Sequence, residues 1–194
     1  MSQKDTGLII VDLQNDFCPG GALAVSEGDC IVPVINDYIA RFQWASAPIF
    51  ATRDWHPPKH ISFNTQGGPW PPHCVQETKG AAFHPGLQLP KSAQVVSKGQ
   101  DPDQDAYSGF QGTDLADRLR KRGIRRVFVC GLATDYCVKA TVLDAVKEGF
   151  VVALLEDAIR GVNIDPKDSE KAIGGMKAAG ATLVRFNEVG GFNL

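Results

Sequence analysis

The sequence alternates short apolar runs with helical patterns along most of its length. Six apolar runs have the length and composition of strands buried on both faces of a sheet, and they span residues 8–11, 48–52, 94–97, 127–130, 151–155 and 182–186. Helical patterns lie between several of them, at residues 30–44, 113–121, 135–147 and 166–179. A strand, a helix and a second strand in this order form a right-handed crossover in a parallel sheet. We therefore predict a doubly wound α/β fold of three layers, with a six-stranded, mainly parallel sheet and helices on both faces.

The length of the chain indicates the number of domains, and its net charge indicates the kind of partner. With 194 residues, of which 43% are hydrophobic and 22% charged, the chain fits a single domain over residues 1–194. Its formal net charge of −2 gives no general attraction to nucleic acid or to an anionic membrane surface. We therefore expect a small-molecule partner, with no nucleic acid and no membrane.

The cysteines indicate a reducing compartment. There are five, at positions 18, 30, 74, 130 and 137, and no two of them form a C-x-x-C pair. This pattern is typical neither of a disulfide scaffold nor of a zinc ribbon. The first residues lead directly into a strand without the apolar stretch of a secretory signal. We expect a cytoplasmic protein.

One long segment, residues 54–91, shows neither a strand nor a helix period. It is rich in proline and glycine and carries all four histidines. Structureless loops of this length in compact domains are usually functional. Ligands of open parallel sheets bind beyond the carboxyl ends of the strands, and the reactive side chains that follow the first four strands are Asp12, Asp54, Lys98 and Cys137. The sequence therefore predicts a site at this edge of the sheet.

Cys137 lies at a predicted turn from strand to helix, where the helix dipole favours a negative charge on sulfur. Lys98 could supply a positive neighbour for the thiolate, and Asp12 could move protons. Each residue also has an ordinary structural explanation: a buried thiol, a solvated lysine and a capping aspartate. Their joint position at strand ends favours a nucleophilic triad.

The long segment also offers metal ligands. Asp54 and His56 are two positions apart, so in an extended chain both point to the same side. With His73 they supply oxygen and nitrogen donors for zinc, iron or manganese, although His60 and His84 compete for the third place. Phe17, Trp70 and Tyr107 lie in the same loops, where they serve either for packing or for stacking on a ligand.

Taken together, these segments resemble the nicotinamidases of the isochorismatase-like cysteine hydrolase superfamily. The resemblance is carried by Ile10-Val11-Asp12-Leu13-Gln14-Asn15-Asp16-Phe17, Arg53-Asp54-Trp55-His56-Pro57, His60-Ile61-Ser62-Phe63, Trp70-Pro71-Pro72-His73-Cys74, Lys98-Gly99, Tyr107-Ser108-Gly109-Phe110, Gly131-Leu132-Ala133-Thr134-Asp135-Tyr136-Cys137-Val138 and Ile159-Arg160-Gly161-Val162. These segments cover nearly the whole chain in order. They imply the same fold with a metal-binding loop insertion.

The resemblance also implies a role for each site residue. Cys137 would be the nucleophile, Asp12 the proton-transferring carboxylate and Lys98 the residue that lowers the pKa of the thiol. The metal ligands would be Asp54, His56 and His73, holding one divalent ion, with zinc first and iron or manganese as alternatives. The pyridine ring would lie among Phe17, Trp70 and Tyr107. The backbone N–H groups of Ala133 and Cys137 match the oxyanion hole of the family, and the peptide between Leu132 and Ala133 matches its cis peptide.

Some relatives add a further metal ligand from the loop after the histidine pair, where this chain has Ser62 and Asn64. The implied activity is hydrolysis of nicotinamide to nicotinic acid and ammonia through a Cys137 thioester, and also hydrolysis of pyrazinamide. A homo-oligomer is expected by the same resemblance.

Three alternatives compete with this activity. Another cysteine amidohydrolase of the superfamily could use the same triad on a carbamoyl or ureido substrate, but such relatives generally lack the metal set. Isochorismatases themselves do not keep the nucleophilic cysteine. A non-catalytic ligand-binding protein, or a redox sensor that uses Cys137, would need neither Asp12 nor Lys98.

Overall fold

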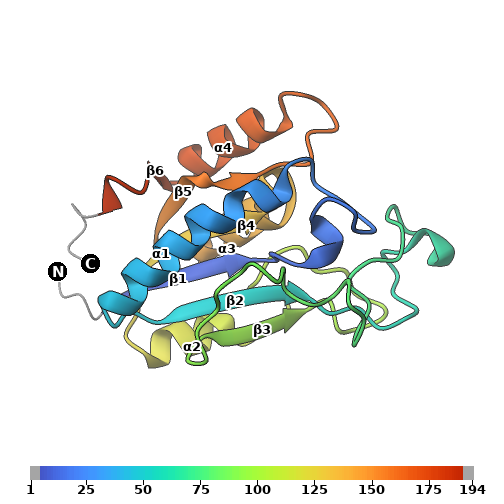
Figure 1. Cartoon of the computed structure of the whole chain (residues 1–194), viewed down its shortest axis with the longest axis horizontal. Coiled ribbons are helices and arrows are strands. Elements are labelled where there is room, and N and C mark those ends of the chain that lie inside the picture. Colours follow the sequence, from blue (N-terminus) through green and yellow to red (C-terminus); the bar gives the residue numbers. More distant parts are fainter. Residues whose placement is uncertain (1–4, 190–194) are drawn as a thin grey trace.

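A six-stranded sheet forms the centre of the computed structural model, which describes residues 5–189 (Figure 1). The strands are β1 Thr6–Val11, β2 Ile49–Asp54, β3 Gln94–Lys98, β4 Arg126–Leu132, β5 Val151–Arg160 and β6 Thr182–Val184. Their order is β3-β2-β1-β4-β5-β6, and every neighbouring pair is parallel. The prediction of a six-stranded, mainly parallel sheet is therefore confirmed, with no antiparallel pair among the described strands.

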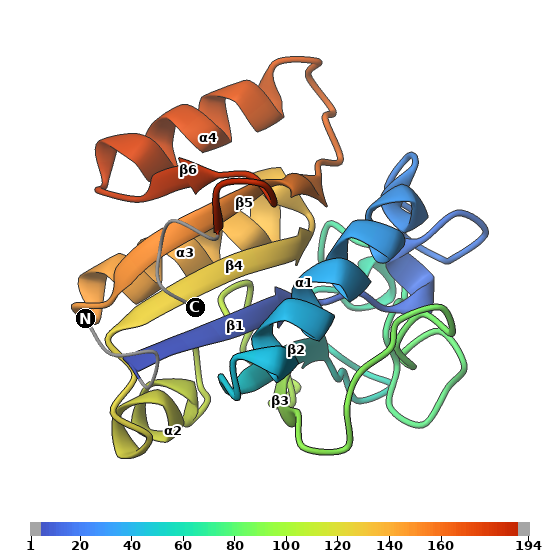
Figure 2. The same cartoon turned by 60° about the vertical axis from the view of Figure 1, so that its left-hand side comes forward.

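Helices cover both faces of the sheet, which confirms the predicted three layers (Figure 2). Helix α1, Val32–Trp44, packs on one face, where Ile35 and Phe42 join the cluster that contains Leu8. Helices α2 Leu115–Lys121, α3 Lys139–Lys147 and α4 Asp168–Ala178 pack on the other face. None of the helices within residues 5–189 combines the length and apolar character needed to cross a bilayer.

Two elements differ from the predicted ranges by more than two residues at one end. The predicted helix 135–147 begins with a π-helical turn, Thr134–Val138, before α3 starts. Strand β5 continues to Arg160, beyond the predicted end at residue 155. It continues because Ile159 and Arg160 still pair with β4 after a shift in register. The polar Asp157 is tolerated there because it accepts hydrogen bonds from the Tyr38 hydroxyl at 2.7 Å and the Phe186 N–H at 3.0 Å.

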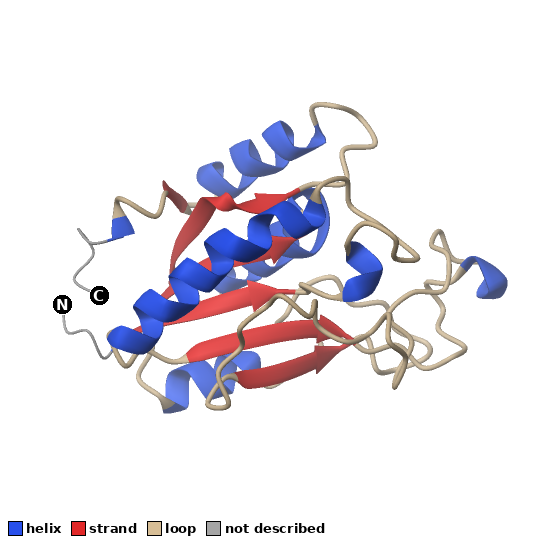
Figure 3. Cartoon of the chain, viewed as in Figure 1, coloured by secondary structure: helices blue, strands red, loops and turns tan. Residues whose placement is uncertain are grey.

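The long loops gather at the carboxyl ends of the strands (Figure 3). The connection from β2 to β3 contains one short 3-10 turn, Asn64–Gln66, and no α-helix among its described residues. After β1 the chain builds β2 and β3 on one side, and β4 then pairs with the other side of β1. The strand order thus reverses next to β1, where ligands of such sheets bind.

Candidate active site

The side chain of Lys98 lies at the centre of the predicted triad. Lys98 is the last residue of β3, and its Nζ lies 2.9 Å from Asp12 Oδ2 and 3.5 Å from Cys137 Sγ. The same ammonium donates to the Ala106 carbonyl at 3.1 Å and forms an ion pair with Asp54. The fold thus brings together all three residues that the sequence predicted as a triad.

Asp12 follows β1 in a left-handed conformation with φ of 47°, which turns the chain out of the sheet. The Thr52 hydroxyl donates to Asp12 Oδ1 at 2.6 Å, and Oδ2 is directed toward Lys98. Burial raises the pKa of Asp12, and Lys98 and Thr52 only partly offset this effect. A carboxyl with a raised pKa is suited to accept and return a proton near neutral pH.

Cys137 lies in the π-helical turn after β4, with 7% of its surface exposed. Burial raises the pKa of its thiol, Lys98 lowers it, and the Asp12 and Asp54 carboxylates raise it further. The net pKa is well above the ordinary value. Lys98 therefore acts in the predicted direction, but burial of the sulfur beside two carboxylates opposes the helix-start effect on its pKa.

The turn before Cys137 has the backbone that the resemblance implied. The peptide bond between Leu132 and Ala133 is cis. The Ala133 carbonyl accepts hydrogen bonds from the N–H groups of Tyr136 at 3.1 Å and Val138 at 3.0 Å, which fixes the start of the turn. Ala133 and Cys137 both line the pocket that contains the thiol.

Asp54, His56 and His73 form a buried group of metal donors. Oδ2 of Asp54 lies 3.6 Å from His56 Nε2 and 3.9 Å from His73 Nε2. The Nδ1 atoms of the two histidines bond to the carbonyls of Gly99 at 2.9 Å and Pro71 at 2.8 Å. Because a carbonyl only accepts, Nδ1 carries the proton and Nε2 keeps its lone pair for a metal. These donors fit a zinc ion that retains open positions.

The other two histidines are engaged elsewhere. Both ring nitrogens of His60 are bonded, Nδ1 to the Ser62 hydroxyl at 2.7 Å and Nε2 to the Gln104 carbonyl at 3.1 Å. His84 accepts from the Gly86 N–H at 3.1 Å. Ser62 thus supports His60, and Asn64 is exposed. The ring of His60 lies only 4.1 Å from that of His56, but both of its nitrogens are occupied. His73 is therefore the histidine that joins Asp54 and His56 with its Nε2 directed at the Asp54 carboxylate.

Aromatic rings form the walls of the pocket above the thiol. Phe17, Trp70 and Tyr107, the three aromatics singled out from the sequence, all line it together with Asp54, His73 and Cys137. The indole N–H of Trp70 donates to the Tyr107 hydroxyl at 2.9 Å. Trp70 and Tyr107 therefore hold each other in place beside a cavity that reaches both the thiol and two of the metal donors.

A family model for the isochorismatase domain matches residues 6–188. The chain belongs to the isochorismatase family. It is 48% identical to the nicotinamidase of Escherichia coli over 197 residues, covering 91% of this chain and 92% of that protein. It is 42% identical to the nicotinamidase/pyrazinamidase of Mycobacterium tuberculosis, covering 91% of this chain and 97% of that protein. The crystal structure of the Pyrococcus horikoshii pyrazinamidase in complex with zinc matches with a TM-score of 0.91 and 55% identity, covering 94% of this chain and 99% of that chain.

Tyr136 is a residue of this isochorismatase-family pocket that was not predicted from the sequence. Its ring lies 5.2 Å from that of Trp70 in an edge-to-face arrangement and 6.0 Å from that of Tyr107, nearly parallel. The sequence feature that could have indicated Tyr136 is its position next to Cys137 in the first turn of a helix. Val162, also in the pocket wall, is held by its N–H, which donates to the Asp135 carboxylate at 2.9 Å.

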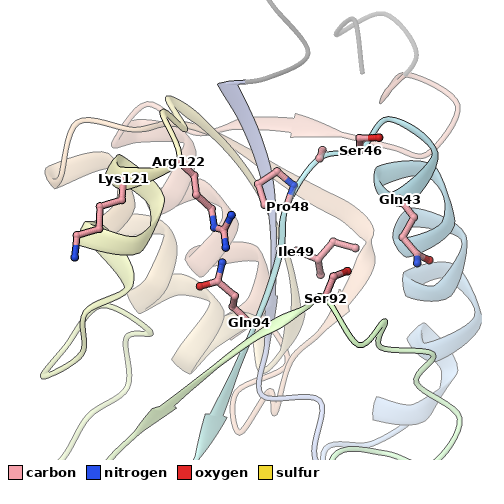
Figure 4. A pocket seen from close by; sticks show the side chains of 9 residues that line it. Gln43, Ser46, Pro48, Ile49, Ser92, Gln94, Lys121 and Arg122 are labelled. Atoms are coloured by element: carbon pink, nitrogen blue, oxygen red, sulfur yellow. The ribbon is translucent and has the colours of Figure 1, made fainter.

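A second cavity lies at the opposite end of the sheet (Figure 4). It measures about 720 Å³, against about 40 Å³ for the pocket above the thiol. Its lining includes Ile49 and Gln94 at the starts of β2 and β3, and Arg122 after α2. It contains none of the predicted site residues, so the smaller pocket is the candidate active site of this isochorismatase-family protein.

Proposed function

We propose that this protein is a nicotinamidase, which hydrolyses nicotinamide to nicotinic acid and ammonia and also accepts pyrazinamide. The observation that carries the proposal is the lining of one pocket: the Cys137 thiol, the metal donors Asp54 and His73, and aromatic rings face the same small cavity. A flat ring amide can present its carbonyl carbon to the thiol while its ring nitrogen faces the metal donors. The relatives named nicotinamidase and pyrazinamidase support this substrate class.

The first half of the reaction forms a thioester. Asp12 takes the proton of the Cys137 thiol, and the sulfur attacks the amide carbon. Asp12 then gives this proton to the amide nitrogen, and ammonia leaves. Oδ2 of Asp12 suits this transfer, because it forms an ion pair with Lys98 but, within the described residues, accepts no well-aligned hydrogen bond.

The second half reverses the roles. Asp12 takes a proton from a water molecule, whose oxygen attacks the thioester carbon. The carbon–sulfur bond breaks, the proton returns to the thiolate, and nicotinic acid is released. Throughout, the Lys98 ammonium stabilises negative charge on Asp12 and sulfur. The backbone N–H groups of Ala133 and Cys137 are proposed to donate to the carbonyl oxygen as it gains charge.

The metal has a separate task in this proposal. Asp54, His56 and His73 would hold a zinc ion, which would supply a Lewis acid for which the ring nitrogen is a suitable ligand. A substrate without such a nitrogen gains nothing from these three donors. For this reason the metal set favours a ring amide over a carbamoyl or ureido substrate.

The deciding experiment is release of ammonia from nicotinamide by the purified, zinc-loaded protein. Wild type should release ammonia and Cys137→Ala should not. Cys130→Ala is the matched control, because Cys130 is also a buried thiol but lies in β4 with its Sγ near the Ile9 carbonyl. If zinc-loaded wild type releases no ammonia, the proposed function is wrong.

The proposal also includes a single domain over residues 1–194, a cytoplasmic location and a homo-oligomer. Light scattering coupled to gel filtration tests the oligomer directly. Limited proteolysis tests the single domain, which should resist cleavage as one unit. Fractionation of expressing cells tests the location.

A further inference from the structure

Strand β1 ends before its neighbour β2 does. The last residue of β1 that pairs with β2 is Ile10, opposite Ala51, and the turn at Asp12 adds one more backbone bond, from its N–H to the Thr52 carbonyl at 3.2 Å. Strand β2 continues to Asp54, where it still pairs with Lys98 of β3. On the β1 side, the main chain of Asp54 therefore needs another partner.

The side chain of Gln14 takes the place of the missing strand. Its Nε2 donates to the Asp54 carbonyl at 2.8 Å, and its Oε1 accepts from the Asp54 N–H at 2.8 Å. The second Nε2 proton goes to the Ala81 carbonyl at 2.9 Å. A carboxamide carries the same donor and acceptor as a peptide unit, so Gln14 continues the hydrogen-bonding pattern of β1 by one residue. The side chain has no exposed surface.

Asp54 is the residue whose placement matters most at this edge. One of its carboxylate oxygens, Oδ1, forms the ion pair with Lys98, and the other faces Nε2 of His56 and of His73. A small rotation of its backbone would move both oxygens away from their partners. Trp55 N–H, which donates to the Lys98 carbonyl at 3.0 Å, restrains the chain only from the β3 side.

We propose that Gln14 is a positioning residue that holds the main chain of Asp54, so that one carboxylate can serve Lys98 and the metal at the same time. This inference rests on the proposed function, since it takes Asp54 as a metal ligand. Gln14 touches neither the thiol pocket nor the imidazoles in the described contacts. Its effect on the metal therefore passes through the backbone of Asp54.

The test compares the zinc Kd of wild type and Gln14→Met, measured by competition with a chromophoric chelator. Methionine keeps the length of the side chain and removes its donor and acceptors. We expect zinc to bind about 10- to 100-fold more weakly, the range typical when a residue that orients a ligand is changed. At saturating zinc, the kcat of Gln14→Met with nicotinamide should approach the wild-type value, although its zinc Kd stays raised. Excess metal fills the weaker site.

Asn36→Leu is the matched control. Asn36 of α1 also forms two amide-to-backbone bonds, to the Gly86 carbonyl at 2.8 Å and from the Gln88 N–H at 2.9 Å, but it lies outside the site. Its zinc Kd should equal that of wild type. Circular dichroism verifies that each variant is folded. Gln14→Glu, which keeps an acceptor for the Asp54 N–H, provides the same comparison if methionine prevents folding.

Two outcomes would overturn the inference. One concerns only Gln14, and the other concerns the metal site itself. A folded Gln14→Met or Gln14→Glu protein with the wild-type zinc Kd shows that the amide does not position Asp54. If wild type and Asp54→Asn bind zinc equally, the metal site of the proposed function fails and Gln14 loses its role with it. Weakened binding in the Gln14 variants alone, with Asn36→Leu unchanged, supports the inference.

Discussion

Lys98 and Asp54 form a buried ion pair that joins the thiol half of the site to the metal half. Burial by itself would lower the pKa of Lys98, but the Asp12 and Asp54 carboxylates raise it, and the net pKa is well above the ordinary value. Burial would likewise raise the pKa of Asp54, but Lys98 and His56 lower it below its usual range. Both partners are therefore charged although their side chains are almost completely buried.

Lys98→Met should destabilise the protein and abolish activity. The change leaves the Asp12 and Asp54 carboxylates buried without their common cation, and removing one partner of a buried ion pair costs about 3–5 kcal/mol. Urea unfolding measures the loss of stability, and ammonia release measures the loss of activity. Lys147→Met, at the exposed end of α3, is the control and should change neither. An active Lys98→Met protein would contradict the role of the ammonium.

Removal of the metal should weaken binding of the substrate ring more than it changes the reactivity of the Cys137 thiol. Chelation is expected to raise KM for nicotinamide and to leave KM for benzamide, which lacks the ring nitrogen, unchanged. His73→Ala should reproduce the effect of chelation and should lower zinc affinity by more than about 100-fold, since it removes a ligand and not only its support. His84→Ala is the control, because His84 does not join the donor group. Equal KM values with and without zinc would rule out a role of the metal in binding.

Thr52→Val should lower kcat and leave KM nearly unchanged. Valine has the shape of threonine but cannot donate to Asp12 Oδ1, so the carboxylate loses the bond that fixes its rotation. A hydrogen bond to a charged group contributes roughly 1.5–3 kcal/mol, which corresponds to a loss of about 10- to 100-fold in kcat. Steady-state kinetics provides the measurement. Thr182→Val, which removes a bond to the Val152 carbonyl in the sheet, should leave kcat intact.

Tyr136→Leu should raise KM for nicotinamide by about 3- to 10-fold. The change removes ring contacts with Trp70 and Tyr107, and aromatic pairs of this kind contribute about 0.5–1.5 kcal/mol beyond the area they bury. Tyr136→Phe keeps the ring and should retain the wild-type KM. If phenylalanine and leucine raise KM equally, the hydroxyl rather than the ring is the important group.

The sheet and the triad could be predicted because buried parallel strands leave a clear trace in sequence. An apolar run marks each strand, and a polar residue directly after it lies at the carboxyl edge. This logic places Asp12 and Lys98 correctly. It ends β5 too early, because Glu156 and Asp157 interrupt the apolar run and only the structure shows that Tyr38 satisfies Asp157.

Other features of the site depend on contacts between residues that no regular spacing in the sequence connects. Gln14 reaches the main chain of Asp54 across 40 residues, and no spacing rule connects the two. The high pKa of the Cys137 thiol results from burial beside two carboxylates, which a helix-dipole argument does not include. The choice of His73 over His60 depends on Ser62 and Gln104, which occupy both nitrogens of His60.

The two imidazoles come from a different part of the chain than Asp12, Lys98 and Cys137 do. Asp12, Lys98 and Cys137 come from three separate strand ends, whereas His56, His73 and Trp70 all belong to the one connection between β2 and β3. A shorter version of that connection would lack the imidazoles and an aromatic wall, whereas Asp12, Lys98 and Cys137 would remain at their strand ends. The metal donors of the loop and the groups that attack the amide therefore belong to different parts of the chain, and a change in the length of one loop would alter ring recognition without moving a strand.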